Sequence, residues 1–291
     1  MKTARATRTV ALACAALVPV AIGCRGSPSA RPPGPIASAL VALAADFGAS
    51  PTAIADAWVE LEAIAARVEN GHRQSHADLL DDVNSVVFGQ LGYAREIESD
   101  DVRFFRLPSV IADRRGSCLG LGALYLALAE RLDLPLDGIL VPGHFFVRRP
   151  GVEPRNVELL RRGEAMPDAW YRAKYGPFPA EGESSTYFRA LTVSELIAVH
   201  WFNAGNYLRA ARDFPGAERA YARATAEFPE FAEAQASLGA VRQLTGALAA
   251  AATAYQAAAR ARTDLPGLDR NVALLRQEQQ LDASQTRRQS R

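Results

Sequence analysis

One part of the chain carries the residue types that attack a carbonyl group. Cys118 stands in "RRGSCLGLG", His144 in "VPGHFFVRR", and Asn156 and Glu158 in "RNVELL". A cysteine nucleophile needs a base within hydrogen-bond reach, and a third group must hold that base. Asn156 and Glu158 are two residues apart, so on a strand they share one face and either could contact the imidazole. Glu158 would orient His144 and stabilise its imidazolium, whereas Asn156 could only orient it.

The cysteine count makes Cys118 informative. The chain has three cysteines, of which Cys14 and Cys24 lie in the N-terminal segment. Exported proteins usually pair their cysteines, because their compartment is oxidising, so a lone thiol favours a functional role. Ser117 is a good helix N-cap, which would place Cys118 in the first helical turn, where unpaired N–H groups favour a thiolate. The alternative is a small apolar side chain that fills the core.

The elements around Cys118 are predicted to be helices. Apolar residues recur at helical spacing over residues 36–94, and Ser50 followed by Pro51 is a strong start signal. After Cys118, apolar residues at helical spacing form a stripe that faces a core, and they are Leu121, Leu124, Tyr125, Leu128 and Leu132. Leu134-Pro135 is expected to end this helix.

A predicted β-hairpin positions His144. Residues 137–149 are rich in β-branched and aromatic side chains, and Pro142-Gly143 interrupts them just before His144. Such irregularities re-aim side chains and are common beside active sites. Residues 155–160 predict a returning antiparallel strand. Helices followed by a hairpin indicate an α+β fold rather than a doubly wound one.

Metal and cofactor motifs are weak in this sequence. A zinc site built from Cys118 with the same histidine and glutamate has suitable ligand types, but it lacks close paired spacing. His72 and His76 are expected to be solvated in a polar loop, and His200 belongs to a helix. "GSCLG" also satisfies a nucleophile-elbow pattern, but "IADRR" before it is a poor buried strand. No G-K-[ST] follows the glycines around Cys118, so they do not form a phosphate-binding loop. We expect neither a bound metal nor another cofactor.

The charge balance limits the possible partners. Lysine and arginine number 33 against 32 aspartates and glutamates, which argues against binding of nucleic acid. Pairs of arginines flank the three motif segments: Arg114, Arg115, Arg148, Arg149, Arg161 and Arg162. We expect them on a solvated surface. If they gathered around one cleft, they would favour an anionic substrate.

The C-terminal part repeats itself at a spacing of 34 residues. Gly205 matches Gly239, Tyr221 matches Tyr255, and several alanines match in the same way. This period, with small residues at helix contacts, resembles the tetratricopeptide repeat. Two repeats are fewer than a free-standing solenoid needs, so they are expected to pack on the preceding domain. Such repeats predict docking of a protein or peptide partner.

The N-terminal segment is predicted to be a targeting signal. Residues 1–24 carry a basic start and a short apolar run that ends in "VAIGC", which resembles a lipobox with Cys24 as the lipidated residue. Ordinary signal cleavage is the alternative. Residues 25–36 form a tether rich in proline and serine. The expected location is the cell envelope, as a periplasm-facing lipoprotein anchored at Cys24.

Residues 107–163 resemble the transglutaminase-like domain of SirB1-type proteins, which often carry tetratricopeptide repeats downstream. The resemblance extends loosely from residue 41 and implies a papain-like α+β fold. It implies that Cys118 is the nucleophile and His144 the base. Glu158 is the preferred third member and Asn156 the second choice, although the superfamily usually has aspartate there.

These observations predict a domain order. Residues 37–163 form the transglutaminase-like domain and 164–190 a connecting segment. Two repeats and a capping helix fill 191–280, and 281–291 form a disordered tail. We expect a thiol hydrolase or acyltransferase acting on amide or ester bonds. The alternative is a catalytically silent scaffold that binds an envelope protein.

Overall fold

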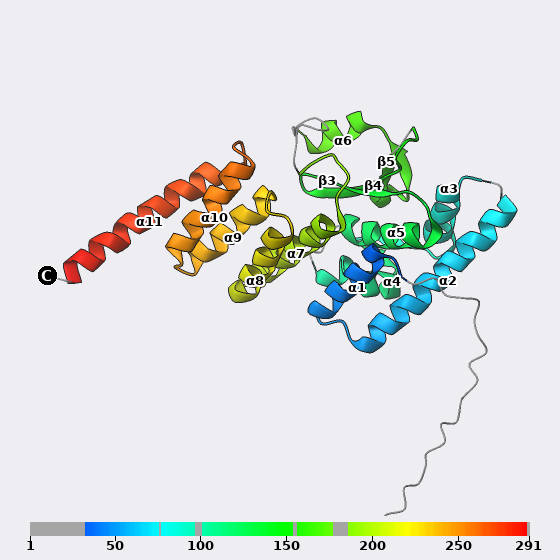
Figure 1. The fold of residues 1–291 in the computed structure, drawn as a ribbon, viewed down its shortest axis with the longest axis horizontal. Helices are drawn as coiled ribbons and strands as arrows, with labels where there is room; N and C mark the ends of the chain where they lie inside the picture. The colour runs from blue at the N-terminus through cyan, green and yellow to red at the C-terminus, as the bar shows by residue number, and fades with distance from the viewer. Residues whose placement is uncertain (1–32, 76, 97–100, 154–155, 177–185, 290–291) are drawn as a thin grey trace, which may run out of the picture. The chain divides into compact units, whose positions relative to one another are not determined.

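The computed structural model describes residues 33–75, 77–96, 101–153, 156–176 and 186–289. The predicted signal peptide and nearly all of the tether lie outside these residues. The described residues form a mixed fold of helices and sheet with a C-terminal helical region (Figure 1). Within them, no helix combines the length and apolarity that a membrane crossing requires.

The part before the sheet is helical, and its elements are α1 (Pro35–Asp46), α2 (Pro51–Ser75), α3 (Leu79–Asn84), the π-helical turn η1 (Ser85–Gln90), the 3-10 turn η2 (Val102–Phe104), α4 (Leu107–Asp113) and α5 (Cys118–Leu132). Helix α5 is the centre of this part, because nearly every face of it is apolar or small. Its residues 119–129 are all buried. It contacts α1, α2 and α4 on one side and β3 and β4 on the other, as expected for a helix that is apolar all round.

The sheet holds four antiparallel strands in the order β3, β4, β5, β6, and they are β3 (Asp137–Val141), β4 (His144–Arg148), β5 (Asn156–Glu158) and β6 (Glu164–Met166). A tight turn at Pro142-Gly143 joins the first two, with Gly143 at a φ of +70°. Phe145 packs against α5, where a Cβ added to Gly122 would lie only 2.3 Å from the Phe145 ring. A separate two-stranded parallel pair joins β1 (Ala94–Arg95) and β2 (Arg115–Gly116).

The other face of the sheet is covered by α6 (Asp168–Tyr175). Tyr171 stacks on Phe146 with ring centroids 3.9 Å apart. The expected connecting segment at 164–190 therefore contains a strand and a helix that complete the sheet and cover it. Aromatic side chains from this segment bury the outer face of the hairpin, which the hairpin sequence alone leaves uncovered.

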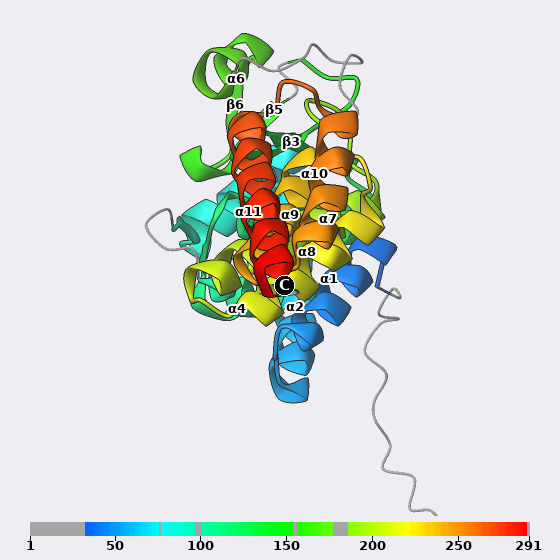
Figure 2. The ribbon, with the colours of Figure 1, turned by 90° about the vertical axis from the view of Figure 1, so that its left-hand side faces the viewer.

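The C-terminal region consists of α7 (Val193–Ala210), α8 (Phe214–Glu227), α9 (Ala232–Leu244), α10 (Leu248–Ala261) and α11 (Leu268–Gln289). Consecutive helices contact one another (Figure 2). Tyr221 of α8 packs on Gly205 of α7, and Tyr255 of α10 packs on Gly239 of α9 in the same way. A Cβ at either glycine would lie 2.5–2.6 Å from the tyrosine ring, so only glycine fits against the ring at both positions. This contact explains why a glycine and a tyrosine recur together at the spacing of 34 residues.

Helix α7 joins this region to the N-terminal part. It contacts α1 and η2, and the Trp201 ring meets Phe47 edge-on at 4.7 Å. A capping box fixes its start, because Thr192 accepts from the Glu195 backbone while the Glu195 side chain accepts from the Thr192 backbone. The helical region thus packs on the preceding part through α7.

Two local expectations were wrong. Helix α11 continues to Gln289, whereas residues 281–291 were expected to be disordered. The tail is rich in glutamine and arginine, which are good helix formers. His72 lies in the last turn of α2 rather than in a loop, and its Nδ1 is 2.7 Å from Asp82 Oδ2. His76 lies outside the described residues.

Candidate functional site

Cys118 is the first residue of α5, and the turn before it is held from two sides. Ser117 caps the helix by accepting from the Gly120 N–H at 3.3 Å. Its own hydroxyl donates to the Phe104 carbonyl at 3.1 Å, and its N–H donates to the same oxygen at 2.8 Å. A Cβ at Gly120 would lie 2.0 Å from that carbonyl, so only glycine fits there. Cys118 is partly exposed, so it is not sealed in the core.

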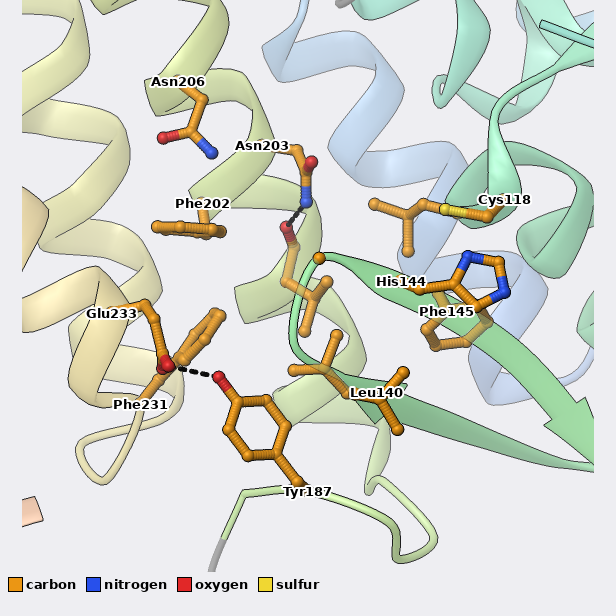
Figure 3. A pocket seen from close by; sticks show the side chains of 14 residues that line it. Cys118, Leu140, His144, Phe145, Tyr187, Phe202, Asn203, Asn206, Phe231 and Glu233 are labelled. Carbon is orange, nitrogen blue, oxygen red and sulfur yellow. Dashed lines mark hydrogen bonds between the residues drawn. The ribbon is translucent and has the colours of Figure 1, made fainter. Parts of the chain in front are cut away.

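His144 is the first residue of β4 and is 4% exposed. Its Nε2 lies 2.7 Å from Oε2 of Glu158, the last residue of β5. Figure 3 shows one imidazole nitrogen turned toward the Cys118 sulfur. Because Nε2 is bonded to Glu158, the nitrogen that faces Cys118 is Nδ1. The three side chains therefore form a line in which the imidazole stands between thiol and carboxylate.

Glu158 is fixed at both carboxylate oxygens. Oε2 accepts from His144, and Oε1 accepts from the Leu160 N–H at 3.0 Å. The Glu158 side chain thereby caps the 3-10 turn η3 (Leu159–Arg161). The Glu158 side chain is 1% exposed. A carboxylate held in this way keeps the imidazole in one orientation and one tautomer.

The second candidate for the third position, Asn156, has a different role. Its Oδ1 accepts from Arg148 Nε at 2.8 Å, and its Nδ2 donates to the Met166 carbonyl at 3.1 Å. Asn156 and Arg148 are direct partners in the pairing of β4 with β5. The structure therefore brings Glu158, and not Asn156, to the imidazole.

The environment of His144 favours its charged form. Burial disfavours the imidazolium, but the neighbouring Cys118 and the hydrogen-bonded, charged Glu158 outweigh burial and raise the pKa of His144 to about 9. At neutral pH the imidazole is therefore protonated.

Two tyrosines of α6 complete the surroundings of the imidazole, and the sequence analysis missed both. The Tyr175 ring stacks on His144 with centroids 4.5 Å apart and planes 6° apart. Tyr171 is fully buried beside it, and burial, with the nearby Glu158 charge, raises the pKa of both tyrosines. Their i, i+4 spacing in "DAWYRAKY" predicts that the two rings share one face of a helix, but it does not show that this face meets His144.

A cavity of about 170 Å³ adjoins Cys118 and His144 (Figure 3). Its apolar wall is formed by Leu119, Leu140, Val141, Phe145, Val199, Phe202 and Phe231. Tyr187, Asn203, Asn206 and Glu233 add polar groups. Helices α7 and α9 thus supply part of a cavity that ends at the reactive side chains.

The other candidate groups lie apart from this site. His200 of α7 is fully buried, and burial lowers its pKa to about 4, so it is neutral. None of the six paired arginines lines the cavity. Their bonded partners lie elsewhere: Leu91, Glu96, Asn156, Asp78, Glu164 and Phe88. They therefore do not form the cationic cleft that would favour an anionic substrate.

A metal site would require several ligand side chains to converge on one point. Among the described residues, no three histidine, cysteine, aspartate or glutamate side chains are grouped to hold one ion. The physical reason is the linear order of Cys118, His144 and Glu158. The ring separates the sulfur from the carboxylate, so the three do not converge on one point.

Comparison with known proteins identifies the central part of the chain. Residues 55–197 match the family model described as the transglutaminase-like superfamily. A protein named UPF0162 protein from Xylella fastidiosa strain Temecula1 is 41% identical over 152 residues, which cover 45% of this chain and 51% of the relative. Another of the same name, from strain 9a5c, is 41% identical over 69 residues, covering 23% of this chain and 25% of the relative. The chain thus spans about half or less of these relatives.

Residues 55–197 form a transglutaminase-like superfamily domain. Cys118, His144 and Glu158 all fall within it. The part of the cavity wall that comes from Val199 onward lies outside the matched residues.

Proposed function

We propose that this protein is a cysteine-dependent hydrolase or acyltransferase that acts on amide or ester bonds. The observation that carries the proposal is the line of Cys118, His144 and Glu158, with the thiol open to a cavity. A core cysteine would need neither an imidazole turned toward it nor an adjoining cavity. The membership of residues 55–197 in the transglutaminase-like superfamily supports the same chemistry.

The reaction would run through a thioester. The Cys118 thiolate forms a bond with the carbonyl carbon, and the imidazolium of His144 gives its proton to the departing amine or alcohol as the C–N or C–O bond breaks. In the second step the neutral imidazole takes a proton from water or an acceptor amine, which attacks the thioester and frees the thiol.

Two fixed groups would assist both steps. Glu158 holds His144 and stabilises the imidazolium during the reaction. The backbone N–H of Cys118, at the first position of α5, would donate to the oxyanion.

The proposal also covers the setting of this domain. The repeated contact of a glycine with a tyrosine supports SirB1-type architecture with tetratricopeptide repeats, which would bind a protein or peptide. The "VAIGC" sequence supports a lipid anchor at Cys24 in the cell envelope. Metabolic labelling with an alkyne-tagged fatty acid tests that anchor, and Cys24→Ser should abolish the label.

Alkylation of Cys118 tests the chemistry. We would follow labelling by iodoacetamide in the full chain carrying Cys14→Ser and Cys24→Ser, beside the same chain with His144→Ala. Fast labelling at pH 7 that slows about tenfold or more in the His144→Ala variant is expected for an activated thiol. Equal rates in both proteins would overturn the proposal and favour a silent scaffold.

A further inference from the structure

The cavity beside Cys118 is walled by two regions of the chain. The transglutaminase-like domain contributes Cys118, His144 and the apolar side chains next to them. Phe202 of α7 and Phe231, directly before α9, add to the wall from the C-terminal helices, and their rings pack together with centroids 4.8 Å apart. Both phenylalanines lie beyond residue 197, where the match to the superfamily ends. The domain thus supplies the reactive groups, and the helices after it shape the space in front of them.

The asparagines of α7 on this wall are bonded to neighbours within the helical region. Asn203 Nδ2 donates to the Val199 carbonyl at 2.8 Å. Asn206 Oδ1 accepts from the Tyr221 hydroxyl, also at 2.8 Å. Each amide therefore already has a partner in the protein, and apolar atoms make up most of the cavity surface.

Glu233 belongs to a charged cluster on the side of the cavity away from Cys118 (Figure 3). Its Oε1 accepts from the Tyr187 hydroxyl and from Arg262 Nη1, and its Oε2 is buried. Arg262 Nε also donates to Asp264 at 2.9 Å, so two carboxylates share one guanidinium. The cluster disfavours an anionic group, and an ammonium group would lose its hydration in a largely apolar space. The cavity is therefore suited to an uncharged, apolar group.

We propose that this cavity receives a short apolar group of the substrate, next to the bond that Cys118 attacks, and that Phe202 determines how large that group can be. This inference rests on the proposed function of Cys118. The cavity volume is about 170 Å³, and an apolar protein cavity of about 150 Å³ is large enough to bind benzene. One branched aliphatic or aromatic side chain therefore fits, whereas a long fatty chain does not. The inferred substrate is a peptide-like amide or ester with an apolar residue at the bond.

N-substituted iodoacetamides test the size of the cavity. Their arms are methyl, isobutyl, benzyl, naphthylmethyl, dodecyl and aminoethyl groups. Each reagent forms a bond from Cys118 Sγ to carbon and releases iodide and the thiol proton, which leaves the arm beside the cavity. Rates are measured on the full chain with Cys14→Ser and Cys24→Ser and are divided by the rates with glutathione. Since one methylene in a fitting apolar pocket changes a rate about tenfold or more, the isobutyl and benzyl arms should react at least about tenfold faster than the methyl arm.

Two substitutions at Phe202 change the space in opposite directions. Phe202 is half-buried, so its ring can be changed without opening the centre of the core. Phe202→Leu should make the naphthylmethyl arm as fast as the benzyl arm. Phe202→Trp should reduce the preference for benzyl over methyl to about twofold and retain the preference for isobutyl.

Phe214→Leu is the matched control. Phe214 is a half-buried phenylalanine of α8 that lies outside the cavity. This variant should keep the order of rates found in the protein with native Phe202. Circular dichroism shows whether each variant retains its helices, and the rates of the native protein test the inference by themselves if a variant does not.

Four results would overturn the inference. Equal normalised rates for all arms would show that the cavity selects no group. Fastest labelling by the dodecyl arm would assign a fatty chain, and fastest labelling by the aminoethyl arm would assign a cationic substrate. An order of rates that is the same in folded Phe202→Leu, Phe202→Trp and Phe214→Leu would exclude Phe202 as the limiting residue. None of these results affects the proposed function, because that is read from plain iodoacetamide and its dependence on His144.

Discussion

Replacing Glu158 by glutamine removes the charge beside His144 while keeping the size of the side chain. His144 Nε2 and Glu158 Oε2 are 2.7 Å apart, and the two side chains are 3% and 1% exposed, so solvent screens their interaction little. A hydrogen bond to a charged group contributes about 1.5–3 kcal/mol. Since about 1.4 kcal/mol corresponds to one pH unit, the pKa of His144 should fall from about 9 to about 7–8.

Proton NMR measures this directly. The chain has four histidines, and His144→Ala assigns the His144 signal by its loss. The His144 C2 proton is titrated in the native chain and in Glu158→Gln. At pH 7.5 the variant should also react more slowly with iodoacetamide, because less imidazolium faces Cys118.

Glu164→Gln is the matched control. Glu164 pairs with Glu158 in the sheet register, but its side chain is 48% exposed and bonds Arg161. It should leave the His144 titration unchanged. The reasoning is refuted if His144 titrates at the same pH in the native chain and in Glu158→Gln, because the carboxylate would then not stabilise the imidazolium.

Gly122→Ala should lower the free energy of unfolding by about 1–3 kcal/mol in urea denaturation, because the new Cβ would lie 2.3 Å from the Phe145 ring. Tyr175→Ala should slow iodoacetamide labelling at pH 7 and Tyr175→Phe should preserve it, since the stacked ring 4.5 Å away stabilises the imidazolium; equal rates would exclude that role. The native pKa of His144, about 9, exceeds its ordinary value of 6.5, so its stabilising effect is complete below about pH 6.5 and is lost as the pH rises through 9. Urea denaturation at pH 6 and 9.5 should show this loss, and His144→Gln should not show it.

The sequence by itself determined the local elements of the site. Ser117 as N-cap, the apolar residues from Leu121 onward and Leu134-Pro135 predicted the α5 helix, because capping and periodicity act between residues close in the chain. The β-branched and aromatic run interrupted by Pro142-Gly143 predicted the hairpin in which β4 begins at His144. The α+β arrangement followed from the order of these elements.

Only the tertiary structure decided which side chains meet. Asn156 and Glu158 share a face, so sequence spacing could not choose between them. The choice depends on the pairing of β4 with β5, which sets Arg148 against Asn156 and leaves Glu158 at the imidazole. Such pairing is a property of two strands and is not encoded in either one alone.

For the same reason, the sequence did not predict that the α6 tyrosines contact the site or which residues form the cavity wall. Tyr175 reaches His144 because α6 folds back over the sheet. Phe202 and Glu233 reach the cavity because α7 packs on the N-terminal helices and brings α9 with it. Local interactions determined where helices and strands form, and burial of apolar surface between distant segments determined what faces Cys118.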